Sequence, residues 1–245
     1  MDLSIIIPTY NEARKIAVDI GKLSDYLSKN KISAEIIISD DGSSDDTVAV
    51  AKSCNVANDI KLTVLATKKN SGKGFAIKQG VASANGNVVM YCDAGNCTPY
   101  QMIKKGMALL NSNDCDIAHA SRKLTQSNIT RQPTWYRRIV SKFFFTFVVQ
   151  FMHLPNHLTD TQCGFKLYKK NVAKTLYQSL VTYGFTYDIE IIMRANAANH
   201  HIKEFPIEWA SDADSRVKPL RLLTTTLTSL IKIKKMNFNT NTNMN

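Results

Sequence analysis

The sequence is poor in cysteine, and its cysteines do not form pairs. Five of the 245 residues are cysteine, they are scattered along the chain, and no Cys-x-x-Cys motif occurs. This pattern excludes a disulfide-stapled scaffold and gives no support to a structural zinc site. We interpret the adjacent His200 and His201 as ordinary surface or helix-end residues. Free, scattered cysteines are typical of a reducing compartment, so we expect a cytoplasmic protein.

Long apolar stretches are also missing. No segment reaches the roughly 20 consecutive apolar residues that a membrane-spanning helix needs. The first residues have no basic region ahead of their apolar run, so we expect no signal peptide.

Acidic residues are scarce only in the second part of the chain. Residues 1–100 hold 11 Lys and Arg against 11 Asp and Glu, whereas residues 101–245 hold 20 against 9. The net charge of +11 therefore lies entirely in the second part, which predicts an anionic partner there. Charge alone allows nucleic acid, anionic lipid or a phosphorylated acceptor. Because the usual recognition motifs are absent, we expect no nucleic-acid partner.

Short apolar runs alternate with segments of helical spacing in the first half. The runs at 3–7 and 34–38 predict buried strands, and the runs at 62–65 and 87–92 predict two further strands. The segments 11–29, about 45 onward and 74–84 predict helices. This βαβ rhythm predicts an α/β fold with a mostly parallel sheet and helices on both faces. In such sheets, ligands bind beyond the carboxyl ends of the strands.

The second half is less regular. We expect strands at 115–120, 163–168 and 202–209 (the last at a sheet edge), and helices at 187–199 and 219–235. Residues 135–152 form a long apolar, aromatic segment. The predicted organisation is an α/β domain over 1–210, divided into a nucleotide half (1–100) and an acceptor half (101–210). A loop and amphipathic helix follow at 211–236. The Asn-rich tail 237–245 is expected to be disordered.

Polar residues cluster where the first-half strands end, which predicts a nucleotide pocket. A flat pocket for a base needs hydrogen-bond acceptors, and the candidates are Pro8, Thr9, Tyr10, Glu12, Asp40 and Asp41. The alternative is that Asp40-Asp41-Gly42-Ser43 only forms a turn and caps the next helix. Ser71-Gly72-Lys73-Gly74 offers backbone N–H groups and a cation at a helix start, which suits an anion, although such a segment is also an ordinary loop.

Several motifs occur in an order that points to one family. They are Ile5-Ile6-Ile7-Pro8-Thr9-Tyr10-Asn11-Glu12, Ser39-Asp40-Asp41-Gly42-Ser43-Ser44-Asp45-Asp46-Thr47, Asn70-Ser71-Gly72-Lys73-Gly74, Asp160-Thr161-Gln162-Cys163-Gly164-Phe165-Lys166 and Tyr183-Gly184-Phe185-Thr186-Tyr187-Asp188-Ile189-Glu190. Together they resemble the family 2 inverting glycosyltransferases, which have the Rossmann-like GT-A fold. The last two motifs resemble the dolichyl-phosphate β-glucosyltransferase branch more than the mannosyl branch. The likeness covers roughly residues 3–235.

This resemblance implies transfer of a hexose, expected to be glucose, from a UDP-sugar to a polyprenyl (dolichyl-type) phosphate at the cytoplasmic membrane face. Two alternatives stay open. One is transfer to a hydroxyl of a glycan or small molecule, with Asp188 as base. The other is a nucleotide-sugar-binding protein with reduced activity.

The second alternative arises because the family's metal-binding Asp-x-Asp motif is incomplete. Asp93-Ala94-Gly95 keeps only the first acid. Hard divalent cations prefer carboxylate oxygens. Three interpretations compete: Mg²⁺ or Mn²⁺ held by Asp93 with water and the diphosphate, metal-independent neutralisation by Lys and Arg, or a degraded enzyme. We expect the first.

Two phosphate groups must be brought together, which requires cations more than a strong base, because a phosphate monoester is largely dianionic at neutral pH. Arginine forks match phosphate oxygens at two points. By resemblance, Arg122, Arg137 and Arg138 face the acceptor phosphate and Arg216 closes over the diphosphate. Gln162 and Lys166 line the acceptor side. Asp93, Arg122 and Asp188 are the candidate catalytic residues.

Two amphipathic segments suggest peripheral membrane association. Within 219–235, Leu220, Leu223, Leu227, Leu230 and Ile231 share one helical face and lysines gather at the end, while 143–152 is apolar and aromatic. Both suit helices lying at a lipid surface, with packing against the protein core as the alternative.

Overall fold

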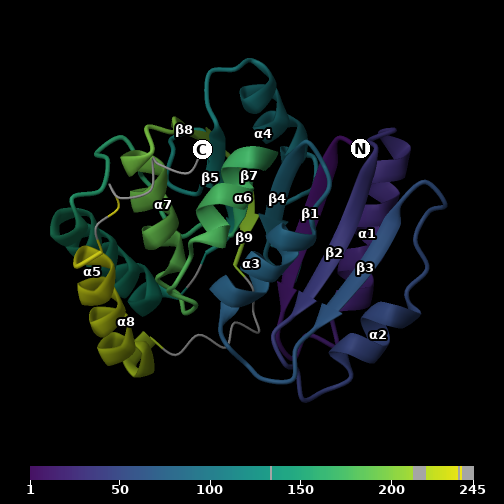
Figure 1. The fold of residues 1–245 in the computed structure, drawn as a ribbon, viewed down its shortest axis with the longest axis horizontal. Helices are drawn as coiled ribbons and strands as arrows, with labels where there is room; N and C mark the ends of the chain where they lie inside the picture. The colour runs from purple at the N-terminus through teal and green to yellow at the C-terminus, as the bar shows by residue number, and fades with distance from the viewer. Residues whose placement is uncertain (133, 212–218, 237, 239–245) are drawn as a thin grey trace.

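A computed structural model describes residues 1–132, 134–211, 219–236 and 238 (Figure 1). The predicted loop at 211–218, apart from Ser211, and the tail after Phe238 lie outside these residues, and so does Arg216.

The core of the fold is one large, mostly parallel sheet. Its strand order is β3-β2-β1-β4-β7-β5-β8. The strands are β1 (Leu3–Thr9), β2 (Ala34–Asp40), β3 (Lys61–Ala66), β4 (Val88–Cys92), β5 (Ile117–Ser121), β7 (Phe165–Lys169) and β8 (Ile202–Pro206). Strand β7 runs antiparallel to both β4 and β5, and the other pairings are parallel. This arrangement confirms the α/β fold with a mostly parallel sheet.

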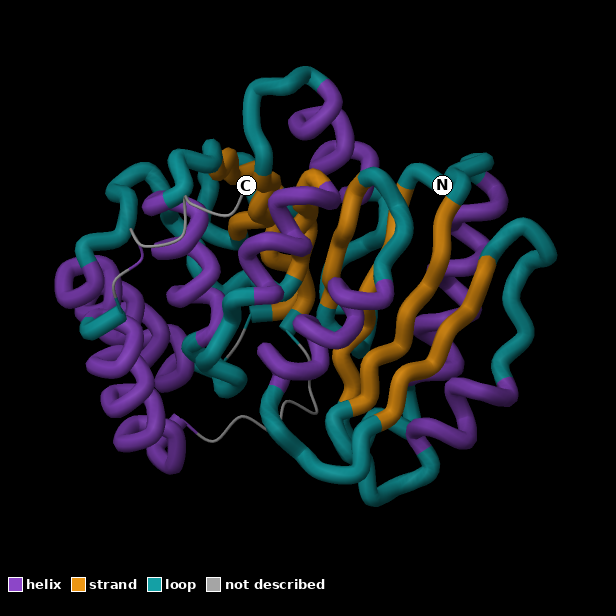
Figure 2. Tube along the Cα trace, in the orientation of Figure 1, coloured by secondary structure: helices purple, strands orange, loops and turns teal. Residues whose placement is uncertain are grey.

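Two layers of helices cover the sheet, as predicted (Figures 1 and 2). The helices are α1 (Ile16–Lys29), α2 (Thr47–Ser53), α3 (Lys73–Ser83), α4 (Met102–Asn111), α5 (Trp135–Met152), α6 (Lys170–Gln178), α7 (Tyr187–Ala197) and α8 (Pro219–Lys234). Side chains of β1 alternate between two cores, because successive residues of a strand point to opposite faces. Ile5 and Ile7 pack with α1, α2 and α4, whereas Ile6 packs on the side of α3 and α5 to α8.

A small second sheet explains why residues 202–209 do not form one strand. β8 lies at the edge of the large sheet, as predicted, but the chain then leaves it. β9 (Glu208–Ala210) pairs in parallel with β6 (Asn128–Arg131).

Helices α5 and α8 lie side by side at one end of the molecule, with α8 in yellow in Figure 1. The apolar face predicted for α8 is divided in the structure. Leu230 and Ile233 are buried in the core, whereas Leu227 and Ile231 are 45% and 40% exposed. The expectation that the whole stripe faces lipid is therefore wrong for Leu230. No helix in the described ranges combines the length and apolarity needed to cross a bilayer.

Candidate functional site

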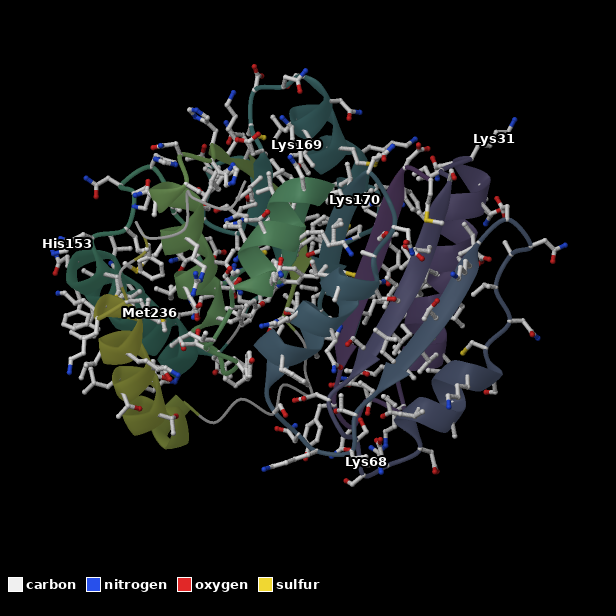
Figure 3. The ribbon with its side chains drawn as sticks, viewed as in Figure 1. Lys31, Lys68, His153, Lys169, Lys170 and Met236 are labelled. Carbon is white, nitrogen blue, oxygen red and sulfur yellow. The ribbon has the colours of Figure 1, made fainter. Side chains whose placement is uncertain are left out.

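The predicted pocket residues gather at one edge of the sheet. β1, β2 and β4 are neighbours and parallel, so the residues that end them lie close together. This edge is at the bottom of the sheet in Figure 1, and Figure 3 labels Lys68 there.

Asp40 is used within the fold. The residue is 1% exposed, and its carboxylate accepts hydrogen bonds from Thr9 Oγ1 at 3.2 Å and from the Ser43 backbone N–H at 2.9 Å. Asp40 therefore stabilises the turn after β2, which is the alternative role predicted for the Asp40-Asp41-Gly42-Ser43 segment.

Asp41 holds the glycine-rich loop in place. Its two oxygens accept the backbone N–H groups of Ser71 at 2.9 Å and Gly72 at 2.7 Å. Burial raises the pKa of Asp41, although these two hydrogen bonds oppose the shift. The Gly74 N–H donates to Tyr183 O at 2.8 Å. The backbone N–H groups of Ser71, Gly72 and Gly74 are therefore already hydrogen-bonded within the protein, and the prediction that they bind an anion is wrong for these three residues.

The remaining residues of the predicted base pocket lie on and beyond β1. Pro8 is buried in the strand, and Tyr10 is 44% exposed at its end. Asn11 adopts φ +57° and its side-chain oxygen accepts the Ser44 N–H at 2.8 Å. The Glu12 N–H donates to Thr47 Oγ1 at 2.7 Å. These contacts join the loop after β1 to the loop after β2 and present Tyr10 to solvent.

Lys73 and Asp93 form an ion pair at the centre of this edge. Lys73 Nζ lies 2.5 Å from Asp93 Oδ1, and the two side chains are 25% and 41% exposed. Burial lowers the pKa of Lys73, but the carboxylates of Asp93 and Asp188 raise it by more. Lys73 is thus a cation whose side chain is partly exposed to solvent.

Gly164, just before β7, is what allows Asp93 this position. A Cβ atom on Gly164 would lie 2.0 Å from Asp93 Oδ2, and the Asp93 N–H donates to Gly164 O at 2.9 Å. Two residues beyond Asp93, Gly95 adopts φ +94° and its N–H donates to Asp19 Oδ2 at 2.6 Å.

Arg122, at the end of β5, is held by a buried acid. Its Nε and Nη2 groups donate to Asp160 at 2.6 and 2.8 Å, and its guanidinium carbon lies 5.1 Å from the centre of the Trp209 ring. Burial opposes ionisation of Asp160, but Arg122 overrides this effect and the pKa of Asp160 falls to about 2. Glu204 on β8 accepts the Asp160 N–H at 2.8 Å. The negative charge of Asp93 is one of the causes that raise the pKa of Arg122. The predicted donor residue Asp93 and the predicted acceptor residue Arg122 are therefore close enough to interact electrostatically.

Lys166 and Asp188 form a second ion pair, inside the protein. Lys166 Nζ contacts Asp188 Oδ1 at 2.5 Å and donates to Thr161 O at 2.8 Å, and its side chain is 1% exposed. Tyr91 OH donates to the same Asp188 oxygen at 2.7 Å. Lys166 therefore holds Asp188 in place. Its burial contradicts the prediction that Lys166 lines the acceptor side.

The other predicted residues are more peripheral. Gln162 Nε2 donates to Phe185 O at 3.4 Å. Arg138 is exposed on α5. Arg137 belongs to the same helix, but its side chain lies outside the described part of the structure.

A divalent cation does not fit the donor set around Asp93. Mg²⁺ needs near-octahedral oxygen coordination, yet Asp93 is one carboxylate already neutralised by Lys73. Within the described ranges, no group of three or more His, Cys, Asp and Glu is placed to hold a metal ion. Asn96 Oδ1 lines the same cleft as Asp93 and is buried without a hydrogen-bond partner among the described residues.

Sequence reasoning did not assign roles to Asp160, Glu204 and Gly164. Asp160 and Gly164 both lie in the motif at residues 160–166. The requirement for glycine at position 164 follows only from the structure, because Asp93 lies where a side chain of residue 164 would be. Glu204 gave no signal, because its partners come from a distant loop.

Comparison with known proteins agrees with the family expected from the motifs. Residues 4–177 match the model of Glycosyl transferase family 2. The chain is 31% identical over 228 residues to the dolichyl-phosphate beta-glucosyltransferase of Homo sapiens, which covers 89% of this chain and 70% of the relative. The enzyme of the same name from Dictyostelium discoideum is 30% identical over 229 residues, with coverage of 89% and 69%.

Solved structures with the same fold include two synthases. Mannosyl-3-phosphoglycerate synthase from Rubrobacter xylanophilus superposes with a TM-score of 0.68 at 15% identity, covering 95% of this chain and 72% of the other. Glucosyl-3-phosphoglycerate synthase from Mycobacterium tuberculosis, in complex with Mn²⁺, UDP-glucose and phosphoglyceric acid, has a TM-score of 0.65 at 14% identity, with coverage of 96% and 80%. These likenesses confirm the GT-A fold, and with the family match they identify the chain as a member of glycosyl transferase family 2.

Proposed function

We propose that this enzyme transfers glucose, or a closely related hexose, from a UDP-sugar to a polyprenyl phosphate at a membrane surface. The observation that carries the proposal is the likeness to dolichyl-phosphate beta-glucosyltransferases over nine-tenths of the chain. The arrangement of cations around Asp93 supports it.

The donor side is the edge formed by β1, β2 and β4. Tyr10 provides an exposed ring for the base, and Lys73 provides a reachable positive charge for the diphosphate. In the transfer, the bond from the anomeric carbon to UDP breaks and its electron pair leaves with UDP. A cation near the diphosphate stabilises that developing charge.

The acceptor side is centred on Arg122. Asp160 and Trp209 fix its guanidinium, while its Nη1 group keeps no hydrogen-bond partner among the described residues. A preorganised arginine is suited to hold the acceptor phosphate, whose oxygen then attacks the anomeric carbon. Asp188 is buried and paired with Lys166, which does not favour its use as a base for a hydroxyl acceptor.

The surface of α5 and α8 supports membrane association. Trp135 is 74% exposed and Phe147 is 46% exposed on α5, and Leu227 and Ile231 are 45% and 40% exposed on α8, which packs against α5. Lys142, Lys232 and Lys235 are exposed on the same two helices or directly after them. Apolar side chains with nearby lysines are typical of helices that bind an anionic lipid surface.

A donor and acceptor screen tests this function. UDP- and GDP-sugars are incubated with a short polyprenyl phosphate in Mg²⁺, in Mn²⁺ and in EDTA, and the glycolipid product is measured by mass spectrometry. We expect turnover of UDP-glucose or a close relative. Activity confined to GDP-mannose would refute the branch, and transfer only to soluble hydroxyl acceptors would refute the acceptor. UDP binding without turnover of any donor would support a binding protein instead.

A further inference from the structure

The donor site has a feature that the family resemblance does not anticipate: a lysine is paired with the single acid that remains of the metal-binding motif. Lys73 Nζ lies 2.5 Å from Asp93 Oδ1, and Gly95 stands where the second acid is expected. The loop thus carries its own positive charge at the place where a metal ion is needed in an Asp-x-Asp site.

We propose that the Lys73 ammonium group takes the place of a divalent cation in this enzyme. In the free protein it neutralises Asp93, and when a nucleoside diphosphate binds it turns to the diphosphate oxygens. This inference rests on the proposed UDP-sugar donor, and it replaces our expectation of Mg²⁺ or Mn²⁺ at Asp93.

The backbone around Lys73 is fixed, so only the side chain needs to move. Gly72 adopts φ +114°, and a Cβ there would lie 2.3 Å from Tyr183 O. A Cβ on Gly74 would lie 2.6 Å from Tyr187 Cβ. Both glycines are therefore pressed against the 183–187 segment. Lys73 has a flexible four-carbon side chain on a fixed backbone, and this side chain is partly exposed beside the partly exposed Asp93.

The site also resists the restoration of a second acid. The Gly95 N–H donates to the buried carboxylate of Asp19, which anchors the loop on α1. An aspartate at position 95 would adopt a left-handed φ of +94° and would bring a second negative charge close to Asp19. The conformation of the loop after β4 thus favours glycine at position 95. Without a second acid to bind a metal ion, neutralisation of the diphosphate charge falls to Lys73.

Calorimetric titration of the full chain with UDP tests the proposal apart from any transfer assay. We expect the dissociation constant for UDP to change less than about threefold between EDTA and millimolar Mg²⁺ or Mn²⁺. Lys73→Met should weaken UDP binding by about tenfold or more, the size expected for a charge-assisted hydrogen bond. Lys68→Met is the matched control, because it removes the same charge from an exposed residue at the same edge, and it should bind UDP like the unmodified chain.

The outcomes separate this inference from the proposed function. UDP binding that is lost in EDTA and restored by Mn²⁺ would overturn the inference and leave the function standing, and Asn96→Ala would then be expected to reduce the Mn²⁺ effect. Equal binding by Lys73→Met and the unmodified chain would also overturn it. No UDP binding in any condition would overturn both. Circular dichroism of each variant establishes that it is folded.

Discussion

At the scale of single residues, Gly164 is the glycine that leaves room for the Asp93 carboxylate, and any side chain at this position would collide with it. We expect Gly164→Ala to displace Asp93 and Lys73 and to lower kcat/KM by about 100-fold, the loss typical of a misplacement near 1 Å. Steady-state kinetics on the sugar donor measures this effect.

The matched control is Gly21→Ala on α1, where a Cβ meets nothing within 4 Å. It should keep full activity and gain about 0.5–1 kcal/mol of stability, because alanine favours a helix over glycine. Normal kinetics for Gly164→Ala would contradict the position of Asp93.

Asp160 is the residue whose ionisation should be visible in the stability of the fold. Its pKa is about 2 in the folded protein, below the ordinary 3.8. A carboxyl group with a lowered folded pKa stabilises the protein above its unfolded pKa, and this contribution is lost as pH falls from about 4 to about 2. The contribution at pH 7 is about 2 kcal/mol.

Asp160→Asn should therefore be less stable than the unmodified chain at neutral pH, and the difference should narrow as pH falls below 4. Urea unfolding at pH 7, 4 and 3 measures it. A constant difference at all three values would mean that the Arg122–Asp160 pair does not depend on this charge.

At the scale of elements, α8 divides its apolar side chains between the core and the surface. Leu230 is 1% exposed and Leu227 is 45% exposed on the same helix. Leu230→Ala should cost about 2–4 kcal/mol of stability, because it leaves a cavity, and Leu227→Ala should stay within about 0.5 kcal/mol. Thermal unfolding of the two variants checks the difference, and equal effects would show that α8 does not pack as described.

Strands whose residues are all buried have the clearest signal in the sequence. β1 and β2 are buried at every position, so a continuous apolar run marks each of them clearly. Helices α4 and α6 and strand β6 were not predicted. α6 begins at Lys170, directly after β7 ends at Lys169, and no glycine, proline or polar turn separates the two.

For the site, the sequence analysis proposed residues but no contacts between them. The sequence analysis proposed Lys73, Asp93, Arg122 and Asp188 as site residues, but sequence spacing does not say which side chains form ion pairs. The burial of Lys166 depends on β7 lying between β4 and β5, where Lys166 is opposite Tyr91 and His119. This register is set by tertiary packing, and the local sequence around Lys166 does not indicate it.

At the scale of the whole molecule, the uneven charge and the exposed apolar side chains of α5 and α8 should act together on lipid. We expect binding to vesicles that contain anionic lipid, weakening as NaCl rises from roughly 0.1 to 0.5 M because screening shortens the reach of surface charges. The double variant Leu227→Ser, Ile231→Ser should bind less at every salt concentration. Vesicle flotation measures both effects, and equal binding to neutral vesicles would contradict the role of the lysines.

The pairing of β7 with β4 also determines whether the first half of the chain can be produced as a separate fragment. A fragment that ended near residue 100 would keep the first four strands, but β4 would become a bare edge, since its antiparallel neighbour comes from residues 165–169. All five residues of β4 are buried in the intact protein. Such an edge invites pairing with other chains, so the nucleotide half, made on its own, should aggregate, and the two halves should be soluble only when they are produced together.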